Sequence, residues 1–367
     1  MMMSKSLKIW FAAMTLCGAV VGQAEANPSI LVDVGTGKVL AAHDAFQRWY
    51  PASLTKLMTT YVTFKALQSG QIRLDSPVRM SVNAAKQPPA KMGYRPGTVM
   101  TLNTALTVML VKSANDIAVA VGEAVGGGSE AAFVQRMNVE ARRLGMTGTH
   151  FATPNGLYDP NNYTTARDLA VLAVQIRREF PQYAHYFSIE AVDPGNGRKL
   201  IPNTNVLLGR FDGADGMKTG FICASGFNLI GAATRGNRAV LAVVLGADSQ
   251  EGRAVQAAQL LTEAFHDSPS GGPTLATFRP PANAGTLDQV VDMRKTICSQ
   301  QAMSDRWDAR GPDGKLKINS PYIHAMDHPP VAVRVSLISE PPAPKKGKGK
   351  GKPAPARKPH PQRAAAN

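Results

Sequence analysis

The sequence has few cysteines and only one long apolar run. The first argues against a cysteine-based zinc protein, and the second argues against a protein with several membrane-spanning helices. Neither Cys223 nor Cys298 has a second cysteine or a histidine at metal-ligand spacing, so no zinc site is expected. After residue 26 no apolar stretch approaches the ~20 residues that a membrane-spanning helix needs. The body of the chain is therefore not expected to cross a membrane. The 7 histidines form no spaced cluster, and the chain has no internal repeat.

Residues 1–26 have the features of a secretory signal peptide. Lys5 and Lys8 form a short positive start, residues 9–22 are apolar, and residues 24–26 place small side chains at the two positions that a signal peptidase recognises. We expect cleavage directly after this segment and a location in the periplasm or cell envelope. An uncleaved membrane anchor is the alternative, although the apolar run is short for a bilayer.

Export also bears on the cysteines that remain after cleavage. Cys223 and Cys298 can pair in an oxidising compartment. They can equally be two separate buried thiols, because the sequence does not give the distance between them.

The positive charge is concentrated at the C-terminal end. Residues 341–367 carry eight lysines and arginines and no acidic residue, which is +8 of the formal net charge of +15. This segment has almost no apolar side chains from which to build a core, so we expect a disordered basic tail. Its charge suits electrostatic contact with an anionic membrane face or wall polymer, and a merely solvated tail is the alternative. Export argues against nucleic acid as a partner.

The pattern between the two ends predicts an α+β domain. Strand patterns occur near the start of this region, at residues 30–34 and 38–42, and again near its end, at 228–234 and 239–246. Helical patterns cover residues 53–67, 102–111, 116–125, 133–144, 166–180 and 253–265. Strands from both ends would share one antiparallel sheet with a helical block inserted.

We assign this domain to residues 27–268. Residues 269–340 form a C-terminal extension rich in proline and glycine, with one strand pattern at 331–338. The sequence leaves open whether this extension is a small domain or an irregular wrap on the main body.

Ser53 and Lys56 form the first of three short polar motifs. They stand at positions i and i+3 of an expected helix, so both side chains lie on one face. A serine hydroxyl is a weak nucleophile until a base takes its proton, and a lysine whose pKa is lowered by burial is such a base. The N–H of Ser53, in the first helical turn, is free to stabilise an oxyanion. A capping serine beside a surface lysine is the alternative.

Ser113 and Asn115 form the second motif, between two apolar helical runs. There Ser113 would pass a proton between Lys56 and a leaving amine, and Asn115 would orient Lys56 and donate to the substrate amide. The same pattern occurs at Ser81, but its proline- and lysine-rich surroundings indicate a mobile loop. A helix cap is the alternative for Ser113.

Lys218, Thr219 and Gly220 form the third motif and are expected on an edge strand. Lysine supplies positive charge, threonine a hydroxyl, and glycine lets a substrate backbone approach closely. This combination suits a substrate that ends in a free carboxylate. The backbone N–H of Phe221 is a candidate for the second donor of an oxyanion hole. An ordinary turn-to-strand junction is the alternative.

The three motifs in this order resemble those of the low-molecular-weight penicillin-binding proteins, in particular the D-alanyl-D-alanine carboxypeptidases. Residues 51–58, 112–116 and 215–220 resemble that family's signatures, as do 155–157 and 165–168. The resemblance covers roughly residues 27–265. It implies a β-lactamase/transpeptidase-like fold with no metal and no organic cofactor.

The resemblance also implies an activity. Ser53 would attack the carbonyl between two terminal D-alanines of a peptidoglycan stem peptide and release the last one, and water would then hydrolyse the acyl-enzyme. β-Lactams would acylate Ser53 as inhibitors. The implied residues are Ser53, Lys56, Ser113 and Asn115 for catalysis, and Lys218, Thr219, Gly220 and Phe221 for substrate binding.

The chain departs from the family pattern at three points. Some relatives carry histidine where Phe221 stands, and some carry an arginine at the position of Thr204, which leaves more of the carboxylate binding to Lys218 and Thr219. Many relatives end in a β-rich domain and an amphipathic helix, and the sequence shows no such helix. The basic tail is the candidate for weak peripheral membrane association.

Three other functions remain as alternatives. A DD-endopeptidase would share the active site and differ in the shape of its groove. A class A β-lactamase would need a Glu-x-x-Leu-Asn loop between Asn115 and Lys218, and none is present. A non-catalytic envelope-binding protein would not need the intact pair of Ser53 and Lys56.

Overall fold

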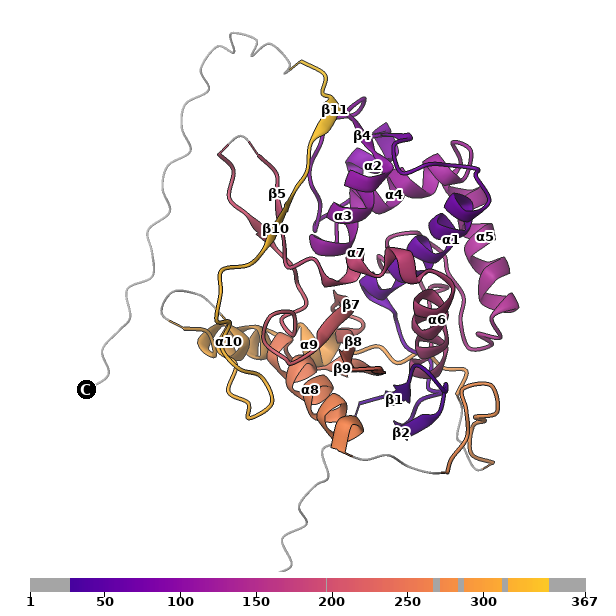
Figure 1. Ribbon diagram of the computed structural model, residues 1–367, viewed down its shortest axis with the longest axis vertical. Helices are drawn as coiled ribbons and strands as arrows, with labels where there is room; N and C mark the ends of the chain where they lie inside the picture. The colour runs from indigo at the N-terminus through magenta and orange to yellow at the C-terminus, as the bar shows by residue number, and fades with distance from the viewer. Residues whose placement is uncertain (1–26, 196, 267–270, 283–286, 312–315, 343–367) are drawn as a thin grey trace, which may run out of the picture.

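The computed structural model describes residues 27–342 except residue 196 and residues 267–270, 283–286 and 312–315 (Figure 1). The expected signal peptide, residues 1–26, lies outside the described residues, as does the basic tail from residue 343 onward. The described part is an α+β structure, as the sequence predicts. One antiparallel sheet is built from both ends of the domain, with a helical block between its strands.

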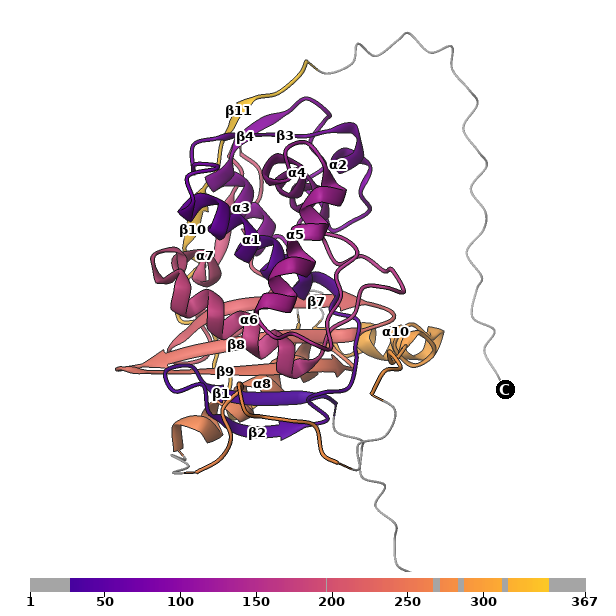
Figure 2. The ribbon, with the colours of Figure 1, turned by 90° about the vertical axis from the view of Figure 1, so that its right-hand side faces the viewer.

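The main sheet has the strand order β2-β1-β9-β8-β7. Its strands are β1 (Ser29–Asp33), β2 (Val39–His43), β7 (Ala214–Ile222), β8 (Gly226–Arg235) and β9 (Arg238–Ala247). The N-terminal strand β1 pairs with β9 so that Ile30 faces Val243 across the ladder. β7 lies at the edge of the sheet, and Figure 2 shows it as the strand nearest the helical block. The polar motif at its centre is therefore on an edge strand, as expected.

The helical block lies between β2 and β7 in the chain. Its elements are η1 (Ala52–Thr55), α1 (Lys56–Gln68), α2 (Val82–Lys86), α3 (Leu102–Val111), α4 (Asn115–Val125), α5 (Glu130–Arg143), α6 (Ala166–Glu179), η2 (Pro181–Tyr183) and α7 (His185–Ser188). Side-chain oxygens of Thr101, Ser129 and Thr165 accept hydrogen bonds from the first turns of α3, α5 and α6, which fixes where these helices begin. α3 spans the predicted residues, and its side chains are nearly all buried because the other helices surround it.

The two faces of the sheet are covered by different helices. Figure 1 shows α8 (Gln250–His266) on one side and α6 with the rest of the block on the other. Alternate residues of β9 follow this division, since Val243 belongs to the core with the block and Val244 to the core with α8. This period of two is the pattern of a strand buried on both faces.

The C-terminal extension wraps over the main body instead of forming a separate domain. It contains α9 (Arg294–Ile297), α10 (Gln300–Asp308), β10 (Ala332–Arg334) and β11 (Leu337–Ser339). β10 pairs with β5 (Ala191–Asp193), which also pairs with β6 (Ile201–Pro202). β11 pairs with β4 (Val99–Thr101), which also pairs with β3 (Pro77–Arg79). The single strand predicted at 331–338 is thus two short strands, because each half joins a different sheet.

Two sequence expectations are settled by this arrangement. Cys223 and Cys298 form a disulfide, which the sequence left open. Ser81 does not lie in a mobile loop, because its hydroxyl caps α2 by accepting a hydrogen bond from Ala84 N at 2.9 Å.

No single helix of the described residues is long and apolar enough to span a membrane, and α4 and α5 meet that test only as a pair bent by 86°.

Candidate active site

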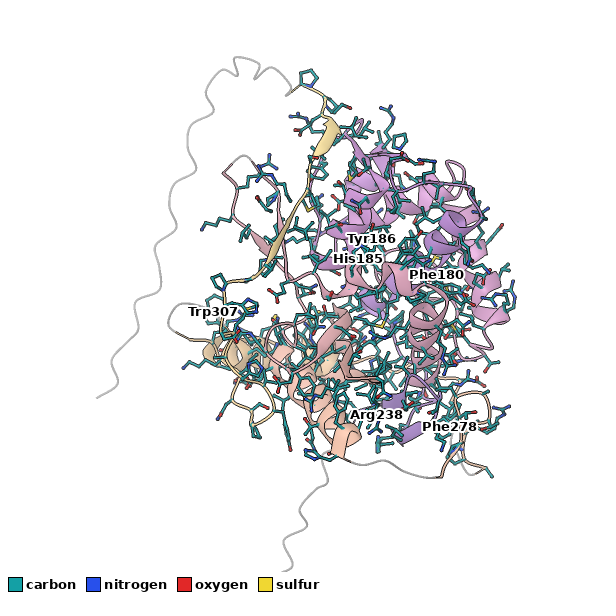
Figure 3. The ribbon with its side chains drawn as sticks, viewed as in Figure 1. Phe180, His185, Tyr186, Arg238, Phe278 and Trp307 are labelled. Carbon is teal, nitrogen blue, oxygen red and sulfur yellow. A yellow bond between two sulfur atoms is a disulfide. The ribbon has the colours of Figure 1, made fainter. Side chains whose placement is uncertain are left out.

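The three motifs meet in one cleft between β7 and the helical block. This cavity has a volume of about 340 Å³ and is lined by Ser53, Ser113, Asn115, Thr219, Gly220 and Phe221 among others. A larger cavity of about 610 Å³ lies beside Phe278, which Figure 3 labels near the edge of the molecule, and contains none of the motif residues. We therefore take the smaller cleft as the candidate active site.

Ser53 lies in the short 3₁₀ helix η1, and α1 begins only at Lys56. The prediction of one helix from residue 53 was therefore slightly wrong, although the Lys56 side chain still reaches Ser53 Oγ. The turn starts with Ala52 at a φ of 48°, a left-handed conformation that costs ~1–2 kcal/mol for a residue with a side chain. The closely packed surroundings hold this turn, since Ala52 and Leu54 are fully buried.

Gly156 packs directly against this turn. A Cβ atom on Gly156 would lie 1.8 Å from the backbone oxygen of Ala52 and 2.7 Å from Thr55 Oγ1. Only glycine permits this contact, and its φ of 80° also favours glycine. The loop that carries Gly156 thereby fixes the position of the nucleophile candidate.

Lys56 is fully buried, and its Nζ has three oxygen neighbours. Nζ lies 2.9 Å from Ser53 Oγ, 2.8 Å from Asn115 Oδ1 and 2.7 Å from the backbone oxygen of Asn155. Burial and then the nearby charge of Lys218 hold the pKa of Lys56 well below its usual range. A neutral amine beside a serine hydroxyl is the arrangement that general-base activation requires.

Ser113 is held in the cleft by an unusual backbone conformation. Its φ is 61°, which turns the chain sharply between α3 and α4. Lys218 Nζ donates a hydrogen bond to Ser113 Oγ at 2.9 Å, so this serine is a partner of the β7 motif and not a helix cap.

Asn115 begins α4 and links Lys56 to the neighbouring loop. Its Oδ1 accepts from Lys56, and its Nδ2 donates to the backbone oxygen of Pro88 at 3.1 Å. The next residue, Asp116, is buried and accepts from the backbone N–H groups of Met92 and Gly93. The loop that forms this side of the cleft is therefore fixed to the start of α4.

Lys218 and Thr219 point from the edge strand into the site. Burial, with the charge of Arg253 as a smaller cause, lowers the pKa of Lys218 to about 7. Thr219 Oγ1 lies 2.6 Å from Thr204 Oγ1. Thr204, the residue that departs from the family pattern, is thus a direct neighbour of the motif threonine.

Gly220 lets β7 approach the nucleophile turn. A Cβ atom there would lie 3.0 Å from the backbone oxygen of Pro51 and 3.1 Å from the backbone nitrogen of Ser53. Phe221 follows in the strand and lines the cleft. Its ring contacts that of Phe227 on β8, with centroids 4.2 Å apart, and its side chain is 41% exposed.

Arg253 of α8 is a site residue that sequence analysis did not identify. It is buried and lines the cleft, and its guanidinium donates to the backbone oxygen of Gly220 at 3.0 Å. Burial lowers its pKa to about 9. A signal existed in the helical pattern, because Arg253 stands four and eight residues before the buried Ala257 and Leu261 and so falls on the buried face of α8.

The described residues offer no evident set of metal ligands. In the residues that the structure describes, no three His, Cys, Asp or Glu side chains are grouped to hold a metal ion.

Comparison with known proteins decides the family. Residues 15–249 match the peptidase family described as D-alanyl-D-alanine carboxypeptidase. The chain belongs to this family. The resemblance suggested by the three motifs is thereby confirmed, and the matched region contains all eight of the predicted site residues.

Individual relatives agree with this assignment. The chain is 33% identical to DacF of Bacillus subtilis over 66% of its own length and 62% of that protein. It is 37% identical to DacD of Escherichia coli over 63% of its own length and 61% of that protein. Both are D-alanyl-D-alanine carboxypeptidases by name, and the chain spans about three fifths of their length.

Solved structures show the same fold. Penicillin binding protein 6B of Escherichia coli aligns with a TM-score of 0.61 at 37% identity, covering 66% of this chain and 77% of that one. Penicillin-binding protein D2 of Listeria monocytogenes, solved with ampicillin bound, aligns with a TM-score of 0.57 at 29% identity. It covers 66% of this chain and 97% of the Listeria chain.

Proposed function

We propose that this protein is a serine D-Ala-D-Ala carboxypeptidase that removes the last D-alanine from peptidoglycan stem peptides. The observation that carries the proposal is the buried Lys56 Nζ, 2.9 Å from Ser53 Oγ, with a lowered pKa. The pair supplies a nucleophile and its base within a family of carboxypeptidases.

Acylation begins at Ser53. Its Oγ attacks the carbonyl carbon between the two terminal D-alanines while its proton passes to the neutral amine of Lys56. The backbone N–H groups of Ser53 and Phe221 stabilise the oxyanion. Ser113 Oγ then gives its proton to the leaving amine, the C–N bond breaks, and free D-alanine departs. The proton held by Lys56 returns to Ser113.

The free carboxylate of the substrate distinguishes a carboxypeptidase from a general peptidase. Thr219 presents its hydroxyl in the cleft, the buried Lys218 places a cation against the cleft residue Ser113, and Arg253 adds a second cation behind Gly220. Thr204 stands at the position where some relatives have an arginine, so Arg253 assists from a different element. Together these groups favour a substrate that ends at the second D-alanine.

Water completes the cycle by hydrolysing the ester on Ser53. Lys56 is again the nearest base, and the products are the shortened peptide and free enzyme. A β-lactam offers the same nucleophile a strained amide, so it acylates Ser53 without releasing a leaving group that diffuses away. The ampicillin-bound Listeria relative supports this part of the proposal.

A DD-endopeptidase that cuts cross-links is the second candidate, because it would use the same residues. A β-lactamase is less well supported, since the chain lacks the Glu-x-x-Leu-Asn pattern that would activate a deacylating water.

The decisive experiment measures D-alanine release from a stem pentapeptide that ends in D-Ala-D-Ala. We expect release by the purified chain, inhibition by penicillin, and neither release nor covalent penicillin labelling by Ser53→Ala. Cleavage of cross-linked dimers without release from the pentapeptide would favour the endopeptidase. Labelling of a folded Ser53→Ala protein would place the nucleophile elsewhere.

Export to the periplasm or cell envelope belongs to the same proposal. The signal-like residues 1–26 support it, and so does the disulfide between Cys223 and Cys298, which is typical of oxidising compartments. The basic residues 341–367 would add salt-sensitive contact with an anionic membrane or wall surface. Deleting them should weaken binding to envelopes at low salt without changing hydrolysis of soluble peptide.

A further inference from the structure

A segment of the C-terminal extension, residues 293–308, is fixed directly beside the end of β7. Met293 N donates to the backbone oxygen of Ala224 at 3.0 Å, and Cys298 is bonded to Cys223. The two attachment points, Cys223 and Ala224, directly follow Ile222, the last residue of β7. We call residues 293–308 the anchored segment.

The anchored segment contacts two walls of the cleft. The guanidinium carbon of Arg306 on α10 lies 5.5 Å from the centre of the Phe227 ring, which lines the cleft beside Phe221. At the start of α9, the guanidinium carbon of Arg294 lies 3.8 Å from the centre of the Tyr158 ring, next to the cleft residue Leu157. The segment therefore borders the cleft where β7 ends.

The direction of a bound substrate leads toward this segment. Under the proposed function, the terminal carboxylate lies at Thr219 and the scissile carbonyl at the N–H of Phe221. The acyl half of the substrate then continues along β7 past Ile222 to Cys223. The acyl half of a stem pentapeptide has four residues and spans about 13–14 Å when extended, so the group attached to its far end is directed toward the anchored segment that Cys223 holds.

α10 presents large apolar side chains to solvent. Met303 is 51% exposed and Trp307 is 71% exposed. They stand four residues apart on the helix and so share a face. Figure 3 shows Trp307 at the outer edge of the molecule. An exposed tryptophan next to Arg306, which contacts the cleft residue Phe227, suits the apolar face of a sugar ring better than a charged peptide.

We propose that Met303 and Trp307 form a secondary subsite that binds the sugar carried by the acyl end of the stem peptide. The inference rests on the proposed function for the direction of the substrate. The anchored segment would thus extend the cleft from the terminal dipeptide to the glycan. The disulfide keeps the subsite at a fixed distance from Ser53.

The test compares two substrates that share the scissile bond. One is the free stem pentapeptide, and the other is the same pentapeptide attached to its N-acetylmuramic acid. We expect the purified chain to prefer the sugar-linked form in kcat/KM. The double variant Met303→Ala with Trp307→Ala should lose this preference, roughly five- to tenfold, and keep its activity on the free peptide. Trp307→Phe should retain part of the preference.

Val139→Ala is the matched control, because Val139 is an apolar residue, 52% exposed, on α5. It should leave both substrates unaffected. An unchanged preference in the double variant would overturn the inference, as would an equal loss on both substrates, which would indicate a structural role.

A binding measurement separates this inference from the proposed function. Calorimetric titration of the Ser53→Ala chain with each ligand needs no turnover. Tighter binding of the sugar-linked form, lost in the double variant, would support the subsite even if the wild-type chain released no D-alanine. Equal binding of both ligands would overturn the subsite while leaving a measured carboxypeptidase activity intact.

Discussion

Lys218 Nζ lies 2.9 Å from Ser113 Oγ, and this contact joins the edge strand β7 to the turn between α3 and α4. Both residues are buried. The proton relay proposed for Ser113 and the carboxylate site proposed for Lys218 are therefore coupled. A change in one is expected to alter the other.

Ser113→Ala should lower kcat/KM for D-alanine release by roughly 10²-fold or more, because it removes the group that delivers a proton to the leaving amine. The stability of the fold should change little, since alanine keeps the same backbone strain at φ 61°. D-alanine release and thermal unfolding check the two expectations.

Ser81→Ala is the matched control for this variant. Ser81 occurs in the same Ser-x-Asn pattern but caps α2. Its loss should cost about 1 kcal/mol of stability and leave the activity intact. Similar losses of activity in both variants would contradict the relay.

The contrast between these serines shows what the sequence alone can predict. Pattern and periodicity located most helices and the strands of the main sheet, because each has a regular apolar spacing. They favoured Ser113 over Ser81 only through its surroundings. The partner of Ser113 is 105 residues away in the chain, and no local pattern encodes such a contact.

Two further features depend on tertiary packing in the same way. Arg253 enters the site because α8 packs its buried face on β8 and β9, so its role follows from the sheet order. The pairing of Cys223 with Cys298 depends on how the extension wraps, and the proline- and glycine-rich residues 269–286 that lead to Cys298 have no periodicity from which that path could be predicted.

Lys56→Met should abolish penicillin acylation while the chain stays folded. Methionine is close to lysine in length, and it removes an amine whose burial disfavours its charged form. The pKa of Lys56 is lower in the folded than in the unfolded chain, so the unfolded chain binds the extra proton. The free energy of unfolding therefore rises with pH up to the usual lysine pKa near 10.5.

Urea unfolding at pH 6 and pH 9 measures this effect. The rise between the two values should be smaller in Lys56→Met than in the wild type. The remaining rise belongs partly to Lys218, whose pKa is also lowered. An identical pH dependence in both proteins would mean that Lys56 has an ordinary pKa in the folded chain.

Gly156→Ala should disrupt the nucleophile turn, because its new Cβ would overlap the backbone oxygen of Ala52. We expect acylation of Ser53 to fall sharply and stability to drop by several kcal/mol. Gly145→Ala is the matched control, with a φ of 69° and no atom within 4 Å of the added Cβ. It should cost only ~1–2 kcal/mol. Penicillin labelling and urea unfolding of both variants make the comparison.

Cys298→Ser should remove the covalent link between the extension and the end of β7. The bond closes a loop with a sequence separation of 75 residues, so its loss should cost about 2–4 kcal/mol in urea unfolding. Reductant should destabilise the wild type by a similar amount and leave the variant unchanged. A variant as stable as the oxidised wild type would mean that the extension is held by its other contacts.

The lowered pKa of Lys218 should make recognition of the substrate carboxylate weaken as the pH rises. Its pKa is lowered to about 7, so it is charged below that pH and neutral above it. The profile of kcat/KM reports groups of the free enzyme. We therefore expect kcat/KM to rise with pH as Lys56 loses its proton. Above about pH 7 it should fall as Lys218 loses its proton.

The same peptide with a terminal carboxamide provides the control. It has no negative charge for Lys218 to hold, so its weaker hydrolysis should show no fall above pH 7. If both substrates fall alike, the charge of Lys218 acts on the proton relay through Ser113 and not on the carboxylate. Comparison of the two pH profiles therefore shows whether the charge of Lys218 acts on the substrate carboxylate or on Ser113.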